Sequence, residues 1–282
     1  MSGADLARRD VARAVAPPAY GRWLASALMV AVAAWFAWIV ATNPNFEWPV
    51  VAKWFTAAAI LRGLAVSLGL TVVAMAIGVA LGLLLAVARL SPSRPLHTGA
   101  ALYIWFFRGT PLLVQLLFWY NLSTLFPTVA IGIPFGPNFA VWNTNDLISP
   151  VTAAIAGLGL NEAAYMAEII RGGLLSVPRG QAETAQAFGM THARALRRII
   201  LPQAIRRMIP AFTNRAVELA KSTSIASVLE VPELMYQARE LSSATFLPLE
   251  TFAVVSVIYF LLIYPVTWAS SVLERRLAVG GV

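Results

Sequence analysis

Residues 63–88 read GLAVSLGLTVVAMAIGVALGLLLAVA and contain no charged side chain. A helix needs about 20 predominantly apolar residues to cross the hydrocarbon core of a bilayer, so this run is long enough to span a membrane. The rest of the 282-residue chain agrees, because 59% of it is hydrophobic and only 12% is charged. Soluble domains carry about twice that charged share. The sequence is therefore that of an integral membrane protein, and it excludes most soluble enzymes.

Further apolar runs outside 63–88 predict five more transmembrane helices, at 23–46, 98–125, 151–170, 209–229 and 251–273. The expected fold class is therefore all-α, with six membrane-spanning helices. A cleaved signal peptide is the alternative for the first run, but its apolar core is about 19 residues long and exceeds the usual 7–15. Lys53 and Arg62 lie among apolar neighbours, and this pattern predicts an interfacial helix over 49–62 on the outer side.

The basic residues indicate the topology. Most of the 21 Lys and Arg residues fall in the segments 1–22, 89–94, 171–207 and 275–276. Six spans put both termini on one side, and cytoplasmic loops carry an excess of Lys and Arg, so we expect both termini in the cytoplasm. Nucleic-acid binding is the alternative explanation of the net charge of +8. The separation of the basic residues into four segments argues against it, and we expect no nucleic-acid partner.

Several kinds of chemistry are missing from the sequence. The chain has no cysteine, and its two histidines, His97 and His192, are far apart, so we expect neither disulfides nor a metal site. A phosphate-binding loop requires Gly-Lys-Ser/Thr, whereas Lys53 and Lys221 both follow alanine. We therefore expect no enzymatic activity and no cofactor in this chain.

Residues 172–208 form the largest predicted cytoplasmic segment, which is too short for a separate domain. Apolar residues recur at three- and four-residue spacing from Ala193 to Ile200, and arginines occupy the other face. Gly189 permits a turn, and Pro202 is expected to end the second helical piece. The pattern indicates a helix–turn–helix with an apolar face available to a partner. An amphipathic helix lying on anionic lipid is the alternative.

Six residues of this segment keep the spacing of the signature E-A-A---G---------I-L-P: Glu183, Ala185, Gly189, Ile199, Leu201 and Pro202. The signature resembles the coupling loop of bacterial ABC importer permeases, with one departure, because Thr184 replaces the first alanine. The resemblance implies that these residues dock on an ATP-binding subunit. Glu183, Ala185 and Gly189 are then expected to be buried in a groove of that subunit.

Other stretches are similar to permeases for polar amino acids: Phe107–Gln115 (FRGTPLLVQ), Ala163–Gly173 and Lys221–Ser224 (KSTS). The resemblance covers residues 61–275 and implies a five-helix type I importer core with a cytoplasmic coupling helix. The remaining predicted parts are a basic N-terminus (1–22), an additional helix with an outer loop (23–60) and a cytoplasmic tail (276–282).

The same resemblance implies a set of partners in the plasma (inner) membrane of a bacterium. It implies two ABC ATP-binding subunits, which would bind the ATP and Mg, and an extracytoplasmic solute-binding protein. A second permease subunit, either another copy or a paralogue, would complete the translocation path for a polar amino acid within the membrane lipid. Which amino acid is carried stays open.

A charge in mid-membrane costs about 2.5–3.5 kcal/mol on insertion scales, so each polar group in the spans needs a reason. Arg215 and Glu218, and Glu168 and Arg171, have the spacing of helical ion pairs. Glu162 has no cation within one turn of its own helix, and a carboxylate can hold the ammonium group of an amino acid. The hypothesis that follows places a substrate path along Glu162, Asn121, Asn161, Gln115 and Tyr165. A structural pairing of Glu162 with a neighbouring span is the alternative, and Tyr165 can equally be a packing aromatic.

The Arg108–Pro111 stretch interrupts the third predicted span. Gly109 and Pro111 permit a kink or a break, and discontinuous helices often line substrate paths. The alternative is that Arg108 only marks a helix edge by reaching toward the interface. The rival functions are a permease of the same architecture for another small solute, and a secondary transporter that needs no ATPase.

Overall fold

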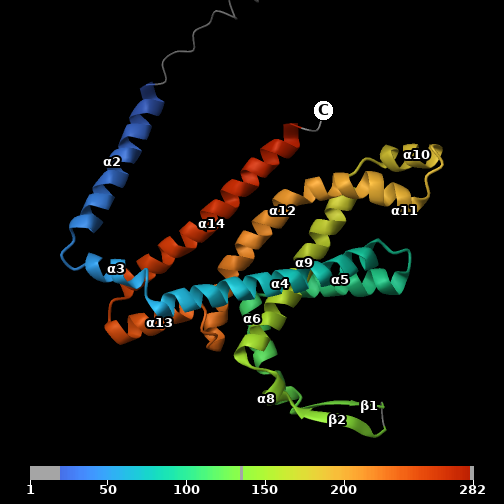
Figure 1. Ribbon diagram of the computed structural model, residues 1–282, viewed down its shortest axis with the longest axis horizontal. Helices are drawn as coiled ribbons and strands as arrows, with labels where there is room; N and C mark the ends of the chain where they lie inside the picture. The colour runs from blue at the N-terminus through green and yellow to red at the C-terminus, as the bar shows by residue number, and fades with distance from the viewer. Residues whose placement is uncertain (1–19, 134–135, 280–282) are drawn as a thin grey trace, which may run out of the picture. The chain divides into compact units, whose positions relative to one another are not determined.

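The computed structural model describes residues 20–133 and 136–279. The described residues divide into two compact units, and the boundary lies between Trp48 and Pro49. Nearly all of the predicted basic N-terminus (1–22) lies outside the described residues, and so does the end of the predicted tail (276–282). Helices make up most of the regular structure, as Figure 1 shows.

The described part of the first unit is dominated by α2 (Tyr20–Thr42), which confirms that the first apolar run is helical. None of its residues is buried, and it is long and apolar enough to cross a membrane. The chain turns just beyond it, where Asn45 N donates to Asn43 Oδ1 (2.9 Å).

Two helices replace the single interfacial helix predicted over 49–62. Three residues separate α3 (Trp48–Trp54) from α4 (Ala58–Leu90). The prediction of one helix was wrong because Ala57 has an extended backbone (φ −62°, ψ 129°). Val51 and Trp54 are buried, so the apolar side of α3 packs against the protein.

The centre of the second unit is the contact between α4 and α9 (Pro150–Leu175). The two helices approach closely at glycines: a Cβ added to Gly78 would lie 2.5 Å from Glu162 Cγ, and one added to Gly82 would lie 2.5 Å from Met166 Cβ. Small residues permit such close packing of helices in membranes. An apolar core surrounds the contact and includes Leu70, Ala74, Leu116, Leu158, Leu219 and Leu229.

The third predicted span, 98–125, is broken rather than continuous. α5 (Arg94–Gly109) and α6 (Leu112–Tyr120) meet at an angle of 104°. The break lies at Thr110, which is extended (φ −113°, ψ 145°) because a residue that precedes proline is disfavoured in the helical region. The interruption predicted from Gly109 and Pro111 is thus confirmed as a break.

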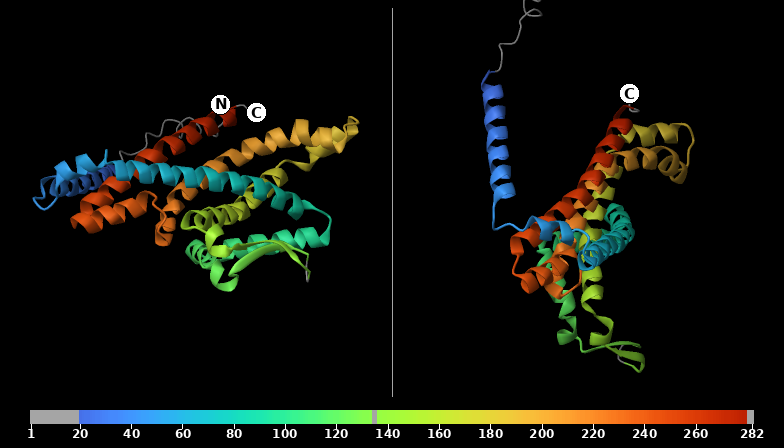
Figure 2. Two further views of the ribbon diagram at one scale, coloured as in Figure 1. Left: turned by 60° about the horizontal axis from the view of Figure 1, so that its bottom comes forward. Right: turned by 60° about the vertical axis from the view of Figure 1, so that its left-hand side comes forward.

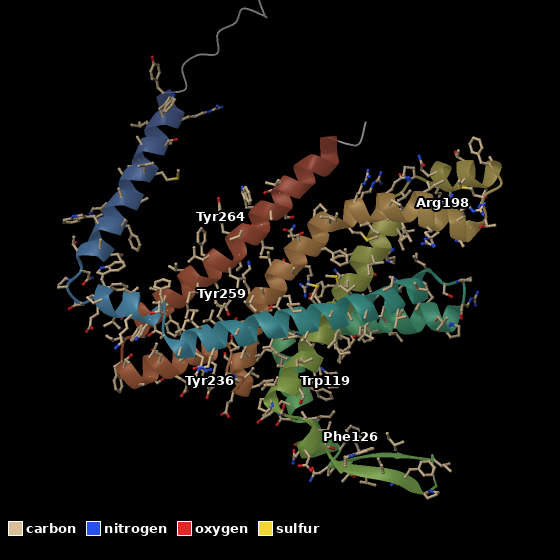
Figure 3. All side chains as sticks on the ribbon, viewed as in Figure 1. Trp119, Phe126, Arg198, Tyr236, Tyr259 and Tyr264 are labelled. Carbon is tan, nitrogen blue, oxygen red and sulfur yellow. The ribbon has the colours of Figure 1, made fainter. Side chains whose placement is uncertain are left out.

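A β-hairpin lies where an uncharged loop was expected, so the all-α prediction was wrong at this point. Beyond α7 (Leu122–Leu125), β1 (Thr128–Gly132) pairs antiparallel with β2 (Asn138–Asn143), and α8 (Thr144–Leu147) follows. Strand pairing was missed because the apolar residues in each strand are consecutive and do not alternate with polar ones. The hairpin projects away from the helices (Figures 1 and 2), and Phe126 lies at its base (Figure 3).

The segment predicted as a helix–turn–helix contains α10 (Arg179–Ala187) and α11 (His192–Ala195), joined by a turn at Gly189, whose φ is +72°. Arg198 lies near the tip of this element (Figure 3). The prediction that Pro202 ends the second piece was wrong. A π-helical turn, η1 (Leu196–Ile200), leads directly into α12 (Leu201–Ser222), and Pro202 occupies the first turn of α12, where proline is tolerated.

The fifth predicted span, 209–229, changes geometry partway. α12 ends at Ser222 and a 3₁₀ segment, η2 (Thr223–Leu229), follows it. α13 (Leu234–Thr245) and α14 (Pro248–Val279) complete the chain. Among the described residues three helices are long and apolar enough to cross a membrane, namely α2, α4 and α14, and the bent pair α5–α6 makes a fourth candidate.

Candidate functional site

A network of polar side chains lies between α9 and α12. Glu162 of α9 is completely buried, and Arg215 of α12 reaches it with Nε, which lies 2.9 Å from Glu162 Oε2 and 3.2 Å from Oε1. Burying a lone carboxylate would be very costly, so this guanidinium neutralises a charge that water cannot reach. The sequence alone did not identify the partner because the two residues are 53 positions apart.

Arg215 has further partners on both sides. Its Nη1 donates to Glu218 Oε2 (2.8 Å), which confirms the pair predicted from helical spacing. Its guanidinium carbon lies 3.6 Å from the centre of the Tyr165 ring, and its Nη2 donates to Asn161 Oδ1 (3.4 Å). One arginine therefore joins two carboxylates, an amide and an aromatic face. The Glu218 side chain is 60% exposed, so this end of the network is open.

Two buried amides connect the network to the break between α5 and α6. Asn161 Nδ2 donates to Gln115 Oε1 (3.1 Å) and to the Phe107 carbonyl oxygen (3.0 Å). Gln115 Nε2 in turn donates to the same carbonyl (2.9 Å) and to Thr110 Oγ1 (2.7 Å). The broken helix leaves backbone acceptors without helical donors, and these side chains satisfy them.

The structure brings together four of the five predicted path residues. Glu162, Asn161, Gln115 and Tyr165 belong to one connected set of contacts. Asn121, in contrast, is exposed just beyond α6 and donates to the carbonyl of Leu117 in that helix (2.8 Å). Tyr165 also lies 5.3 Å from the guanidinium carbon of Arg108. The other predicted pair, Glu168 and Arg171, is confirmed by a 2.7 Å contact.

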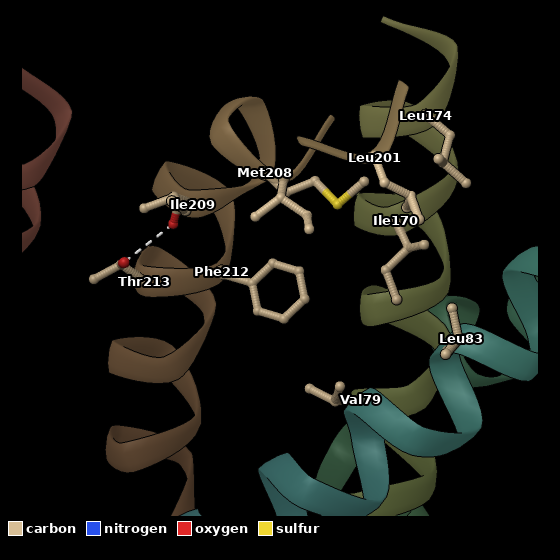
Figure 4. A pocket seen from close by; sticks show the side chains of 10 residues that line it. Val79, Leu83, Ile170, Leu174, Leu201, Met208, Ile209, Phe212 and Thr213 are labelled. Atoms are coloured by element: carbon tan, nitrogen blue, oxygen red, sulfur yellow. Dashed lines mark hydrogen bonds between the residues drawn. The ribbon is translucent and has the colours of Figure 1, made fainter. Parts of the chain in front are cut away.

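An apolar cavity of about 460 Å³ lies elsewhere, between α4, α9 and α12. Figure 4 shows Met208 and Phe212 of α12 facing Ile170 and Leu174 of α9. No charged side chain lines this cavity. A zwitterionic amino acid needs partners for two charges, so the polar network suits such a ligand better than the cavity does.

The predicted coupling residues divide into two groups. Glu183 and Gly189 are exposed, as is Phe188, whose side chain is 83% exposed at the turn. Ala185 is already buried inside the element, where its carbonyl accepts from Met190 N (3.0 Å). The remaining three coupling residues lie along η1 and the start of α12, with Ile199 and Leu201 half-buried and Pro202 exposed.

Comparison with known proteins assigns the family. Residues 78–279 match the family described as binding-protein-dependent transport system inner membrane component. The chain belongs to this permease family. The permease is 39% identical to an arginine transport system permease protein of Corynebacterium glutamicum over 232 residues, which is 81% of this chain and 71% of that protein. It is 44% identical to an octopine transport system permease protein of Rhizobium meliloti over 209 residues, which is 73% of this chain and 80% of that protein.

A solved structure extends this result to the fold. The crystal structure of an amino acid ABC transporter with histidines contains a chain that is 35% identical to the permease. The match covers 82% of this chain and 99% of that chain, with a TM-score of 0.70. The polar network, the broken helix and the α10–α11 element all lie within the part matched to the family, 78–279.

Proposed function

We propose that this chain is the membrane-spanning subunit of an ATP-driven importer for polar amino acids. The observation that carries the proposal is the 35% identity to a chain of an amino acid ABC transporter, over nearly the whole of that chain. Relatives named as arginine, octopine and histidine/lysine/arginine/ornithine permeases support the same class of substrate.

In the proposed topology six segments cross the inner membrane of a bacterium and both termini lie in the cytoplasm. Three or four spans follow from length and composition. The proposal adds α9 and the pair α12–η2, whose polar side chains face one another and are mostly paired with one another. Charged side chains in membrane helices are expected to pair with side chains of neighbouring helices rather than to face lipid.

ATP hydrolysis is proposed to be coupled to transport through α10, α11 and η1, which we name the coupling element (residues 179–200). Two ATP-binding subunits, which bind ATP and Mg, would dock on its exposed turn, where Phe188 projects beside Gly189. A solute-binding protein would deliver substrate from the outer side. A second permease subunit, identical or paralogous, would complete the path.

The substrate path is proposed to run along the polar network. Gln115, Asn161, Tyr165 and Glu162 form its wall, and Asn121 stands beyond them at the end of α6. Because Glu162 is completely buried against Arg215, a substrate ammonium group would meet the carboxylate only by displacing that guanidinium. The exposed carboxylate of Glu218 offers a first contact that needs no such displacement.

Reconstitution tests the proposal. Proteoliposomes that contain the permease with its ATP-binding subunits and binding protein are expected to take up at least one of arginine, histidine, glutamine and glutamate, and only when ATP is inside. Uptake that is equally fast without ATP would indicate a secondary transporter. If none of the four amino acids is taken up but another small solute is, the chain is a permease of the same architecture for a different substrate.

A further inference from the structure

The charges of the polar network are unevenly distributed. Arg215 lies between two carboxylates, with Nε 2.9 Å from Glu162 Oε2 and Nη1 2.8 Å from Glu218 Oε2. One positive charge therefore faces two negative charges, and the excess falls on Glu218, whose side chain is 60% exposed. Lys221, one turn further along α12, forms no ion pair with Glu218 among the described residues.

Arg108, at the end of α5, is a positive charge next to the same network. It is exposed, and its guanidinium carbon lies 5.3 Å from the centre of the Tyr165 ring. Within residues 20–133 and 136–279 no carboxylate forms an ion pair with it. The charge of Glu168 acts on Arg108 from further away, but both oxygens of that carboxylate already accept from Arg171.

The position of Arg108 makes this lack of a carboxylate partner informative. The Tyr165 ring, which Arg108 contacts, belongs to a residue about 15 Å from the end of α9 at Leu175, at 1.5 Å per residue. This depth corresponds to the middle of a hydrocarbon core about 30 Å thick. An ionisable side chain inside a membrane protein is costly, and it indicates a functional site when no structural partner accounts for it.

The amides of the proposed path have no free donors for a substrate carboxylate. Asn161 Nδ2 donates to Gln115 Oε1 and to the Phe107 carbonyl oxygen. Gln115 Nε2 donates to the same carbonyl and to Thr110 Oγ1. Arg108 has five N–H donors in a planar fork that matches a carboxylate, and none of them has an acceptor in the part of the chain that the structure describes.

The two exposed charges of opposite sign belong to one small region. The guanidinium carbons of Arg108 and Arg215 lie 5.3 Å and 3.6 Å from the same ring centre, so they are at most 8.9 Å apart. Glu218 contacts the second of these guanidinium groups directly. A ligand with one positive and one negative group can pair with both exposed side chains, whereas a ligand with a single charge leaves one of them unpaired.

We propose that Arg108 binds the α-carboxylate of the amino acid in the membrane path, while Glu218 receives a positively charged group of the same molecule. An arginine can hold a carboxylate through two parallel hydrogen bonds, which gives the contact direction as well as strength. Every α-amino acid has this carboxylate, so Arg108 recognises the class of substrate and not its side chain.

The test compares ligands that differ only in the charge that Arg108 is proposed to bind. The permease is purified in detergent with its ATP-binding subunits and without the binding protein, whose own selectivity would otherwise enter the measurement. Titration calorimetry then gives the dissociation constants of arginine, histidine, glutamine and glutamate, and of the α-carboxamide of each. The wild-type complex should bind at least one amino acid about 10- to 100-fold more tightly than its α-carboxamide, the range expected for hydrogen bonds to a charged group.

Substitution of Arg108 should remove this preference. In Arg108→Gln the amino acid should bind only as tightly as its α-carboxamide, and the α-carboxamide should bind as it does to wild type. Arg108→Lys keeps the charge without the fork and should show an intermediate preference. Arg239→Gln changes an exposed arginine outside the network and should keep the full preference.

Three results would overturn the proposal. The first is that Arg108→Gln weakens the amino acid and its α-carboxamide equally, because Arg108 then acts on the shape of the site. The second is a preference in Arg108→Lys no greater than in Arg108→Gln, because the charge of Arg108 is then not what the ligand meets. The third is a wild-type complex that binds none of the four amino acids, or that binds each no more tightly than its α-carboxamide.

The inference rests on the proposed function, and ATP-dependent uptake by the complete transporter separates the two failures. If the wild-type transporter takes up an amino acid but Arg108→Gln keeps the preference for the free carboxylate, the assignment of Arg108 is wrong and the importer function stands. If the wild-type transporter takes up none of the four amino acids, the proposed function itself fails.

Discussion

At the scale of single residues, the charge balance around Arg215 is the feature on which the interior depends. The Arg215→Met variant is expected to unfold more easily by about 3–5 kcal/mol, because it leaves the carboxylate of Glu162 buried and unpaired. Denaturant or thermal unfolding in detergent measures the loss. The control variant Arg239→Met removes an arginine from an exposed position and should change stability by less than about 0.5 kcal/mol.

A second substitution separates loss of charge pairing from loss of packing. If the uncompensated carboxylate causes the damage, Glu162→Gln combined with Arg215→Met should recover a large part of the lost stability, because a buried amide costs less than a buried charge. A double variant as unstable as the sum of its single variants would show that Arg215 acts through its packing on Tyr165 instead.

At the scale of elements, the break between α5 and α6 is held by two buried amides, Gln115 and Asn161. Gln115→Leu removes one of the two donors to the Phe107 carbonyl and the donor to the Thr110 side chain, and it deprives Asn161 of an acceptor. We expect a loss of about 1–3 kcal/mol, the cost of leaving buried polar groups unsatisfied. Gln186→Leu, at an exposed position of α10, is the matched control and should be nearly neutral in the same unfolding experiment.

The turn in the coupling element leads to a functional prediction. Gly189 has a φ of +72°, a conformation that costs other residues about 1–2 kcal/mol, and the exposed turn is the proposed docking point. Gly189→Glu should abolish most of the ATPase stimulation caused by loaded binding protein. Gly180→Glu places the same side chain in the first turn of α10, where an acidic residue is favourable, and should retain it. Equal stimulation in both variants would contradict docking at the turn.

The sequence predicted those elements whose signal is local. α2, α4 and α14 follow from long uncharged runs, and the break at Thr110–Pro111 follows from the geometry that proline imposes on its neighbour. The pairing of Glu162 with Arg215 could not be predicted, because it depends on which helices become neighbours. The prediction for Pro202 was wrong because a proline is compatible with the end of one helix and with the first turn of another. Here the π-helical turn η1 continues into α12, so Pro202 lies in the first turn of α12.

At the scale of the whole molecule, the proposed function requires that the coupling element and the α13–α14 junction face opposite sides of the membrane. Phe188, at the coupling turn, and Phe246, between α13 and α14, are 83% and 85% exposed. Both can therefore be replaced by cysteine with little effect on packing, and the native chain contributes no cysteine of its own.

In intact cells with the outer membrane permeabilised, a membrane-impermeant maleimide should label Phe246→Cys and leave Phe188→Cys unlabelled. Inverted membrane vesicles should give the opposite result, because the excess of arginine around the coupling element predicts that this element lies in the cytoplasm. Labelling of both cysteines from the same side would contradict the topology, and with it the docking of an ATP-binding subunit at Phe188.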